Sequence, residues 1–505
     1  MTATAVQQRA ADLDDFVAAL IVLLGSDSVI VPCAPEPEGP GEASLDAYVK
    51  DWRGRYHGQP LAIARPRDTA EVAAVVKLCQ LHKVAIVPQG GNTSLVGASV
   101  PDTSGEQLLL SLTRLNEVLS IDPDNLAMTV QAGCVLADVQ QAAQEAGLLF
   151  PLSLAAEGSC TIGGNLATNA GGTQVLRYGT ARELCLGLEV VTAQGDIWHG
   201  LTALRKDNSG YDLRDLFIGS EGTLGIITAA SLRLFPRPAG QATALVACPD
   251  LQAALALLQR TRQALDAGLV GFELMHAWPL ALVRQHLPSL AAPLESLCQA
   301  TESGAVPEWV VLIDTGHPES HEAAQAALES VLTQALDLGE ALDASLAQSQ
   351  QQRTAMWGLR EAIPSAERSE GLMVKHDIGV PTSAIPTFVL TTEQALQIAF
   401  PGCRVACFGH MGDGNLHYNV AGPAGQDSQA FVHTFEAAVN RVVYDAALAL
   451  NGTLSAEHGI GHLKREVLTE RKSPVALQLM RSLKQALDPA GLMNPGRLLA
   501  PAEPR

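Results

Sequence analysis

The chain has 505 residues, of which 47% are hydrophobic and 17% are charged, so it can bury a large core and is not a disordered protein. Its 33 Lys and Arg residues against 53 Asp and Glu residues give a formal net charge of −20. Phosphate contacts need a basic surface, so nucleic acid is not an expected partner. No stretch reaches the roughly 20 apolar residues of a membrane span. The scattered cysteines and the lack of a basic targeting segment favour a cytoplasmic protein with reduced thiols.

The first half of the chain alternates helices and strands. A buried helix is predicted at 16–24, and a connector rich in Pro, Glu and Gly at 32–41. Further helices are predicted at 69–82 and 136–146, and strands at 84–88, 108–110, 127–131, 186–192 and 224–234. The prolines Pro236 and Pro238 then predict a domain boundary.

The second half continues with helices at 251–267, 322–338 and 431–450 and strands at 270–275, 309–314, 405–408 and 416–420. This order predicts a sheet covered by helices on one face. We expect four parts: an N-terminal helical segment (1–55), a first domain (56–237), a second domain (238–450) and a C-terminal segment (451–505).

Three loops rich in Gly, Ser, Thr and Asn lie within the first domain. They are Pro88–Ser94, Gly158–Asn165 and Gly219–Gly225. Any one of them could equally be a plain turn, but three together indicate a large cofactor with a diphosphate, which backbone N–H groups can hold without positive charge. Neither a Rossmann G-x-G-x-x-G motif nor a Walker Gly-Lys-Ser/Thr motif is present.

Two histidines flank a glycine-rich turn in the second half. His410 and His417 are seven residues apart, and imidazole nitrogens suit zinc or another transition metal. Glu457 is a candidate third ligand, and His458 beside it is a candidate proton acceptor. A single histidine would more often be a hydrogen-bonded structural residue; the combined pattern favours a metal site.

Two cations complete the pattern. Arg360 and Lys375 suit a substrate carboxylate, although such residues alone are usually solvated surface groups. A metal-dependent hydrolase would use the His/His/Glu group and leave the three loops unexplained. A flavin-binding subunit without its own activity is a second alternative.

These motifs together resemble the FAD-linked oxidase superfamily, whose FAD domain is called p-cresol methylhydroxylase-type or vanillyl-alcohol oxidase-type. The resemblance runs from about residue 45 to the tail. Gly-His-x-Gly-Asp-Gly-Asn-Leu-His-x-Asn at 409–419, Glu-His-Gly-Ile-Gly at 457–461 and the tail at 488–496 resemble the branch of D-2-hydroxyacid dehydrogenases. The implied fold is α+β: a two-subdomain FAD domain, a substrate (cap) domain with an antiparallel sheet, and a C-terminal helical segment.

The resemblance also implies roles for individual residues. Noncovalent FAD would be bound by Pro88, Gly90, Gly91, Asn92, Thr93, Ser94, Gly158, Ser159, Gly163, Gly164, Asn169, Glu221, Ile227 and Asn494, with Glu221 and Ile227 near the adenosine. His410, His417 and Glu457 would hold Zn²⁺ or Mn²⁺, and His458 would be the base. Arg360, Lys375 and Asn419 would bind substrate; Ser365 stands beside Pro364, where the family carries a hydroxyl.

The implied activity is oxidation of a D-2-hydroxy acid to the 2-oxo acid by hydride transfer to the flavin. D-2-hydroxyglutarate is the first candidate, with D-malate beside it, because a dicarboxylate offers a partner to both cations. D-lactate and then glycolate are the alternatives. The resemblance implies an electron-transfer flavoprotein or a quinone as electron acceptor, and a homodimer stays open.

Overall fold

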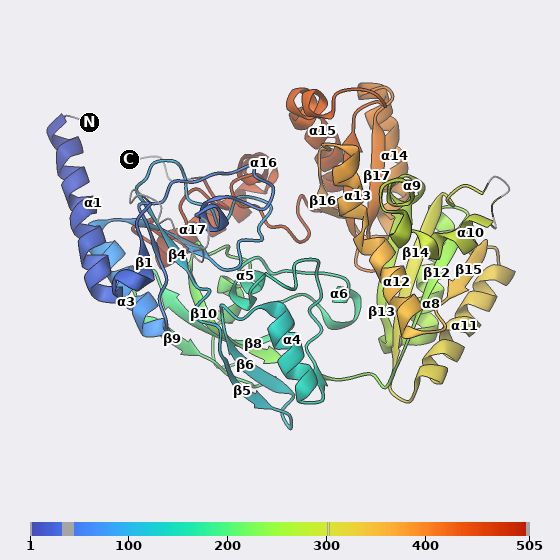
Figure 1. The fold of residues 1–505 in the computed structure, drawn as a ribbon, viewed down its shortest axis with the longest axis horizontal. Coiled ribbons are helices and arrows are strands. Elements are labelled where there is room, and N and C mark those ends of the chain that lie inside the picture. Colours follow the sequence, from blue (N-terminus) through green and yellow to red (C-terminus); the bar gives the residue numbers. More distant parts are fainter. Residues whose placement is uncertain (1–2, 33–44, 300, 302–303, 501–505) are drawn as a thin grey trace. The chain divides into compact units, whose positions relative to one another are not determined.

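The structure is a computed structural model that describes residues 3–32, 45–299, 301 and 304–500 (Figure 1). The predicted connector at 32–41 falls outside these residues except for residue 32. The chain packs as two units. Unit 1 comprises Met1–Ala170, Thr180–Pro236 and Glu457–Arg505, and unit 2 comprises Gly171–Gly179 and Arg237–Ala456. Among the described residues, no helix is long and apolar enough to cross a membrane.

Unit 1 begins with a small mixed sheet. Its strands are β1 (Val29–Ile30), β2 (Ala62–Ala64), β3 (Ala85–Gln89) and β4 (Gln107–Ser111), in the order β1-β2-β4-β3. The helices α1 (Ala3–Leu24) and α3 (Thr69–His82) pack on it through a core that contains Phe16, Leu20 and Val76. The predicted helix at 69–82 is confirmed; Asp68 caps it by accepting a hydrogen bond from Glu71 N. The short helix α2 spans Asp46–Val49.

The second sheet of unit 1 is antiparallel and has the order β5-β6-β10-β8-β9. Its strands are β5 (Val118–Asp122), β6 (Ala127–Gln131), β8 (Cys185–Thr192), β9 (Ile197–Gly200) and β10 (Gly225–Arg233). A two-stranded sheet joins β7 (Leu148–Leu149) to β11 (Phe235–Pro236). The accompanying helices are α4 (Leu136–Glu145), α5 (Ile162–Ala167), α7 (Arg214–Phe217), α16 (Arg465–Arg471) and α17 (Pro474–Leu487).

The end of the chain pairs with the edge strand β3. Ile86 N donates to Leu492 O (2.8 Å), and Asn494 N donates to Ile86 O (2.8 Å). Residues near the C-terminus therefore extend the sheet that carries the first glycine-rich loop.

Unit 2 is built on a seven-stranded antiparallel sheet with the order β15-β12-β14-β13-β17-β18-β16. The strands are β12 (Gly240–Cys248), β13 (Leu269–His276), β14 (Trp309–His317), β15 (Asp343–Leu346), β16 (Asp377–Gly379), β17 (Arg404–His410) and β18 (Asn415–Ala421). The helices are α6 (Val175–Tyr178), α8 (Leu251–Leu265), α9 (Ala277–His286), α10 (Glu295–Gln299), α11 (His321–Asp337), α12 (Gln350–Glu361), α13 (Ile363–Glu370), α14 (Ile385–Ala399) and α15 (Ser428–Ala449).

Helices cover both faces of this sheet, so the prediction of helices on one face only is wrong. Leu245, Ala247 and Met275 point toward the helices α9, α10, α12 and α13. The alternate residues of these strands are buried as well, and α8 and α11 pack there (Figure 1). The helices α12 and α13 belong to one of these two covering layers, and Pro364 lies in the first turn of α13, where proline is tolerated.

Candidate functional site

The three glycine-rich loops come together in unit 1. A side chain on Gly91 in the first loop would overlap the carbonyl oxygen of Ser159 in the second. A Cβ on Gly222, in the third loop, would lie 2.5 Å from Pro88 Cγ. Only glycine allows backbones to approach this closely. Segments separated by about 130 positions in the sequence therefore form one concave backbone surface.

Two buried polar atoms near these loops have no hydrogen-bond partner within the described part of the chain. One is Thr161 Oγ1, which lies where a side chain on Gly90 would have to be. The other is Asn494 Oδ1, although Asn494 Nδ2 donates to Ala98 O (3.0 Å) and Glu221 O (2.8 Å). Buried polar atoms are normally paired, so these two suit a polar ligand at the loops.

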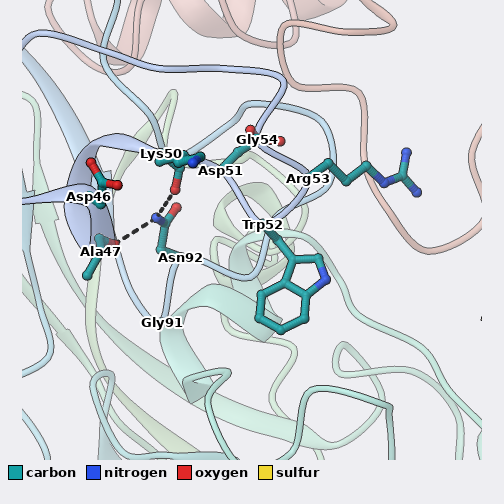
Figure 2. Close-up of a pocket in the computed structure, with 9 residues that line it drawn as sticks. All are labelled: Asp46, Ala47, Lys50, Asp51, Trp52, Arg53, Gly54, Gly91 and Asn92. Atoms are coloured by element: carbon teal, nitrogen blue, oxygen red, sulfur yellow. Dashed lines mark hydrogen bonds between the residues drawn. The ribbon is translucent and has the colours of Figure 1, made fainter. Parts of the chain in front are cut away.

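A pocket of about 580 Å³ opens beside the first loop. Its lining comes from that loop and from the segment around α2: Asp46, Ala47, Lys50, Asp51, Trp52, Arg53, Gly54, Gly91 and Asn92. Figure 2 shows Asn92 Nδ2 donating to Ala47 O (2.9 Å) and Lys50 O (2.8 Å). Asn92, predicted to bind the cofactor, therefore also holds the pocket wall against the loop.

Glu221 has a second contact that the sequence did not suggest. Its carboxylate accepts hydrogen bonds from Ile460 N and Gly461 N, each at 2.7 Å. Burial raises the pKa of Glu221, whereas these two amides favour its charged form. The residue thus fixes the backbone two and three positions beyond His458.

The remaining predicted cofactor residues are spread over the same unit. Thr93 and Ser94 end the first loop. Gly158 and Ser159 precede α5, Gly163 and Gly164 lie in this helix, and Asn169 follows it. Ile227 is buried in the strand β10. Asn169 accepts hydrogen bonds from Thr180 Oγ1 (2.9 Å) and Arg182 N (3.0 Å). Their contacts with FAD stay predictions.

In unit 2, the pairing of strands gathers the other predicted residues on one face of the sheet. His410 on β17 lies opposite Glu273 on β13 and opposite Asn415 on β18. Because side chains alternate between faces, His417 and Asn419 share the face of Asn415. Asp377 on β16 lies opposite His417 and therefore shares this face of the sheet.

The ligand atoms of this group lie close together. A ring nitrogen of His410 lies within 4.8 Å of a ring nitrogen of His417, and a carboxylate oxygen of Asp377 also lies within 4.8 Å of a His417 nitrogen. Ala456 N–H donates a hydrogen bond to Asp377 O (3.3 Å), and Glu457 and His458 are the next two residues in the sequence. Glu457 and His458 begin the last segment of unit 1.

Glu273 bridges two of the predicted residues. One of its oxygens contacts His410 Nδ1 at 2.6 Å, and the other accepts from Arg360 Nε at 2.8 Å. Burial alone would oppose its ionisation, but His410 and Arg360 outweigh that effect and lower the pKa of Glu273 to about 2. Arg360 also stacks on the ring of Phe408, 5.0 Å from its centroid.

Glu367, on α13, likewise bridges two predicted residues, Lys375 and Asn419. It accepts from Lys375 Nζ at 2.6 Å and from Asn419 Nδ2 at 2.8 Å, and it is completely buried. Ser365 is not brought to this group. It is exposed, and at about 100° per helical residue it lies on nearly the opposite side of α13 from Glu367.

Glu273, Glu367 and Asp377 were therefore missed as members of the site. Glu273 could have been noticed, because a carboxylate within the apolar run of residues 270–275 is rarely buried without a partner. Glu367 and Asp377 stand in polar surroundings in the sequence, and no pattern distinguishes them.

Comparison with known proteins identifies the family. The model for the C-terminal domain of FAD linked oxidases matches residues 237–498, and the model for an FAD binding domain matches residues 60–200. The chain belongs to the FAD-linked oxidases. It is therefore a flavoenzyme and an oxidoreductase, and FAD is its cofactor.

This FAD-linked oxidase has close relatives among characterised proteins. It is 41% identical over 449 residues to the mitochondrial D-2-hydroxyglutarate dehydrogenase of Bos taurus, a match that covers 89% of the chain and 78% of that protein. It is 40% identical over 457 residues to the D-2-hydroxyglutarate dehydrogenase of Xanthomonas citri pv. viticola, covering 90% of the chain and 93% of that protein.

Solved structures confirm the predicted fold. A structure of p-cresol methylhydroxylase with substrate bound matches with a TM-score of 0.73 at 17% identity, and the match covers 97% of each chain. An alkyldihydroxyacetonephosphate synthase matches with a TM-score of 0.69 at 18% identity, covering 95% of this chain and 84% of that one. The α+β class with a p-cresol methylhydroxylase-type FAD domain is thus correct.

Proposed function

We propose that this FAD-linked oxidase oxidises a D-2-hydroxy acid to the 2-oxo acid, with D-2-hydroxyglutarate as its first substrate and D-malate as a further one. The observation that carries the proposal is the group on one face of the unit 2 sheet, where two candidate ligand histidines, Arg360 and Lys375 are all held by buried carboxylates or neighbouring strands. The names of the relatives at about 40% identity support the same substrate class.

Noncovalent FAD fits the loops of unit 1. The glycine-rich loops meet closely at Gly91, and the unpaired Thr161 Oγ1 and Asn494 Oδ1 near them offer polar contacts to a diphosphate cofactor. No histidine occurs between Gly90 and Gly97, where some members of the superfamily attach the flavin covalently. Bound FAD would supply the acceptor for the substrate hydride.

A divalent metal, Zn²⁺ or Mn²⁺, suits the two imidazoles of His410 and His417, with Glu457 as the further ligand that the sequence predicts. Such an ion would supply a Lewis acid that lowers the pKa of the substrate hydroxyl. His458 takes the proton of that hydroxyl. Arg360 binds the substrate carboxylate next to the reacting carbon, and Lys375 with Asn419 binds the distal one.

Several further properties belong to the proposal. An electron-transfer flavoprotein or a quinone would be the electron acceptor for bound FAD. The proposed location of the enzyme is the cytoplasm, although the bovine relative is named as mitochondrial. D-lactate, and after it glycolate, is the alternative substrate.

Flavin bleaching tests the proposal. D-2-hydroxyglutarate, D-malate, D-lactate and glycolate are added separately to the purified yellow protein without oxygen, then again after EDTA and after restoring Zn²⁺ or Mn²⁺. We expect D-2-hydroxyglutarate to bleach the 450 nm region fastest, with the effect lost in EDTA and recovered with metal. Fastest bleaching by D-lactate would favour the alternative substrate, and a yellow protein that no acid bleaches would overturn the substrate class.

A further inference from the structure

We propose that Glu273 is a positioning residue that orients both the metal ligand His410 and Arg360, the cation that binds the substrate carboxylate. The inference rests on the proposed function, because it assigns Glu273 to the same site. It adds one residue that no sequence motif indicated, and it predicts that metal binding and carboxylate binding depend on one side chain.

The geometry gives each oxygen of Glu273 a separate task. Glu273 and His410 face each other across the paired strands β13 and β17, and Oε1 contacts His410 Nδ1 at 2.6 Å. Oε2 accepts from Arg360 Nε at 2.8 Å. The glutamate side chain is only 1% exposed, so water does not compete for either contact.

The contact to His410 determines which ring nitrogen can bind a metal. When Nδ1–H donates to a carboxylate, the lone pair of the neutral ring lies on Nε2. A carboxylate behind a ligand histidine also fixes the plane of the ring and makes the histidine a better ligand. Glu273 therefore prepares His410 for coordination through Nε2.

The contact to Arg360 determines which part of the guanidinium faces the substrate. Glu273 uses Nε, and among the described residues no hydrogen bond of Nη1 or Nη2 of Arg360 is found. The two terminal nitrogens form the fork that binds a carboxylate in a bidentate manner. Stacking on Phe408 limits the remaining rotation of the side chain.

Another buried carboxylate in the same sheet offers a matched control. Asp314 on β14 is 2% exposed and accepts from Arg353 Nη2 (2.9 Å) and from Thr243 Oγ1. It forms the same kind of buried carboxylate–arginine pair, but it contacts none of the predicted ligands. Asp314→Asn thus reports what the loss of such a pair does to the fold alone.

The experiment measures metal affinity directly. FAD-loaded wild type, Glu273→Gln and Asp314→Asn are stripped with EDTA and titrated with Zn²⁺ against a chromophoric chelator. We expect Glu273→Gln to bind Zn²⁺ about 10- to 100-fold more weakly, the usual effect of losing the partner of a ligand histidine. Asp314→Asn should keep the wild-type affinity.

A kinetic measurement tests the second task of Glu273. At saturating Zn²⁺, the KM of Glu273→Gln for D-2-hydroxyglutarate should rise about tenfold, since one charge-assisted hydrogen bond that orients Arg360 is lost. If Glu273→Gln does not fold, Glu273→Asp keeps the charge but shortens the reach, and it should show both effects.

The outcomes separate the two proposals. Equal Zn²⁺ affinity of the wild type and the Glu273 variants overturns the positioning role and leaves the proposed function standing. Equal loss of affinity in Asp314→Asn also overturns it, because a general disturbance of the sheet then explains the effect. A wild type that binds neither Zn²⁺ nor Mn²⁺ overturns the metal part of the proposed function, and the role of Glu273 with it.

Discussion

Lys375 is the more accessible of the two cations in unit 2, with 30% of its side chain exposed, whereas Arg360 is 8% exposed. Its ammonium donates a hydrogen bond to Glu367, and part of the side chain is open to solvent. This difference suits a division of work in which Arg360 binds the carboxylate at the reacting end and Lys375 binds the far end of a longer substrate.

Lys375→Ala tests this division. We expect the KM for D-2-hydroxyglutarate to rise roughly 10- to 100-fold, because one charge-assisted contact contributes about 1.5–3 kcal/mol. The KM for D-lactate, which has no distal carboxylate, should change by less than about threefold. Steady-state kinetics with an artificial acceptor measure both values, and Lys472→Ala, an exposed lysine in unit 1, is the control. Equal effects on the two substrates would show that Lys375 does not contact the distal carboxylate.

Glu221→Gln tests the anchoring of the segment that carries Glu457 and His458. A glutamine keeps the size of the side chain but accepts through one oxygen only, so one of the two amide contacts is lost. We expect hydrogen exchange of the peptide around Ile460 and Gly461 to become at least about tenfold faster, in line with the roughly 1–3 kcal/mol of an unpaired buried group. Unchanged exchange together with lost FAD would instead support the adenosine contact that the sequence suggested.

At the scale of elements, the sequence predicted more of the fold than of the site. Strands such as Ala85–Gln89 and helices such as Thr69–His82 were found because periodicity and caps are local properties. The partnership of Glu273 and His410 depends on the register of two strands 137 residues apart, which no local pattern encodes. Of the candidate site, the histidines and cations could be predicted; a buried glutamate could have been suspected at position 273, but its partners could not.

The close approach of the glycine-rich loops at Gly91 can be tested with a single substitution. Gly91→Ala would push a methyl group into the carbonyl of Ser159, and such overpacking costs about 1–3 kcal/mol. We expect the purified variant to lose most of its FAD, measured as the ratio of absorbance at 450 and 280 nm. Gly210→Ala, in the same unit but with open space around it, should retain FAD. A yellow Gly91→Ala protein would contradict the close approach.

Glu370 links three elements of unit 2, since it ends α13 and contacts Arg404 on β17 (2.7 Å) and His286 at the end of α9 (3.3 Å). The hydrogen bond from Arg404 lowers the pKa of Glu370 below its usual 4.5. A carboxyl with a lowered pKa in the folded state stabilises fully above pH 4.5, and its contribution disappears as the pH falls through the folded value.

The stability difference between wild type and Glu370→Gln should therefore be largest at pH 6 and shrink below about pH 4.5. Thermal unfolding between pH 3.5 and 6.5 measures it. Glu295→Gln provides the comparison, because Glu295 also pairs with an arginine, Arg284, but its side chain is more exposed than that of Glu370. A difference that grows on acidification would have the wrong sign and would reject the assignment.

At the scale of the whole molecule, unit 1 is assembled from three separated stretches of the chain. Its last stretch supplies Leu492 and Asn494 to the edge of β3, and Lys484 Nζ donates to Thr223 O and Met493 O, each at 2.7 Å. Removal of residues 485–505 should therefore abolish FAD retention and lower the unfolding temperature. Absorbance and calorimetry measure the two effects; a truncated protein that stays yellow would show that the tail is dispensable.

The return of the chain to its first sheet also has a consequence for synthesis. A ribosome delivers β3 and its loop some 400 residues before the segment at 492–494 that pairs with that edge. Until then the edge of β3 is open, and an open edge can pair with other chains. The flavin site is thus complete only after residues 492–494 have been made, so the open edge of β3 is exposed to other chains during most of synthesis, and a chaperone that covers this edge would reduce mispairing.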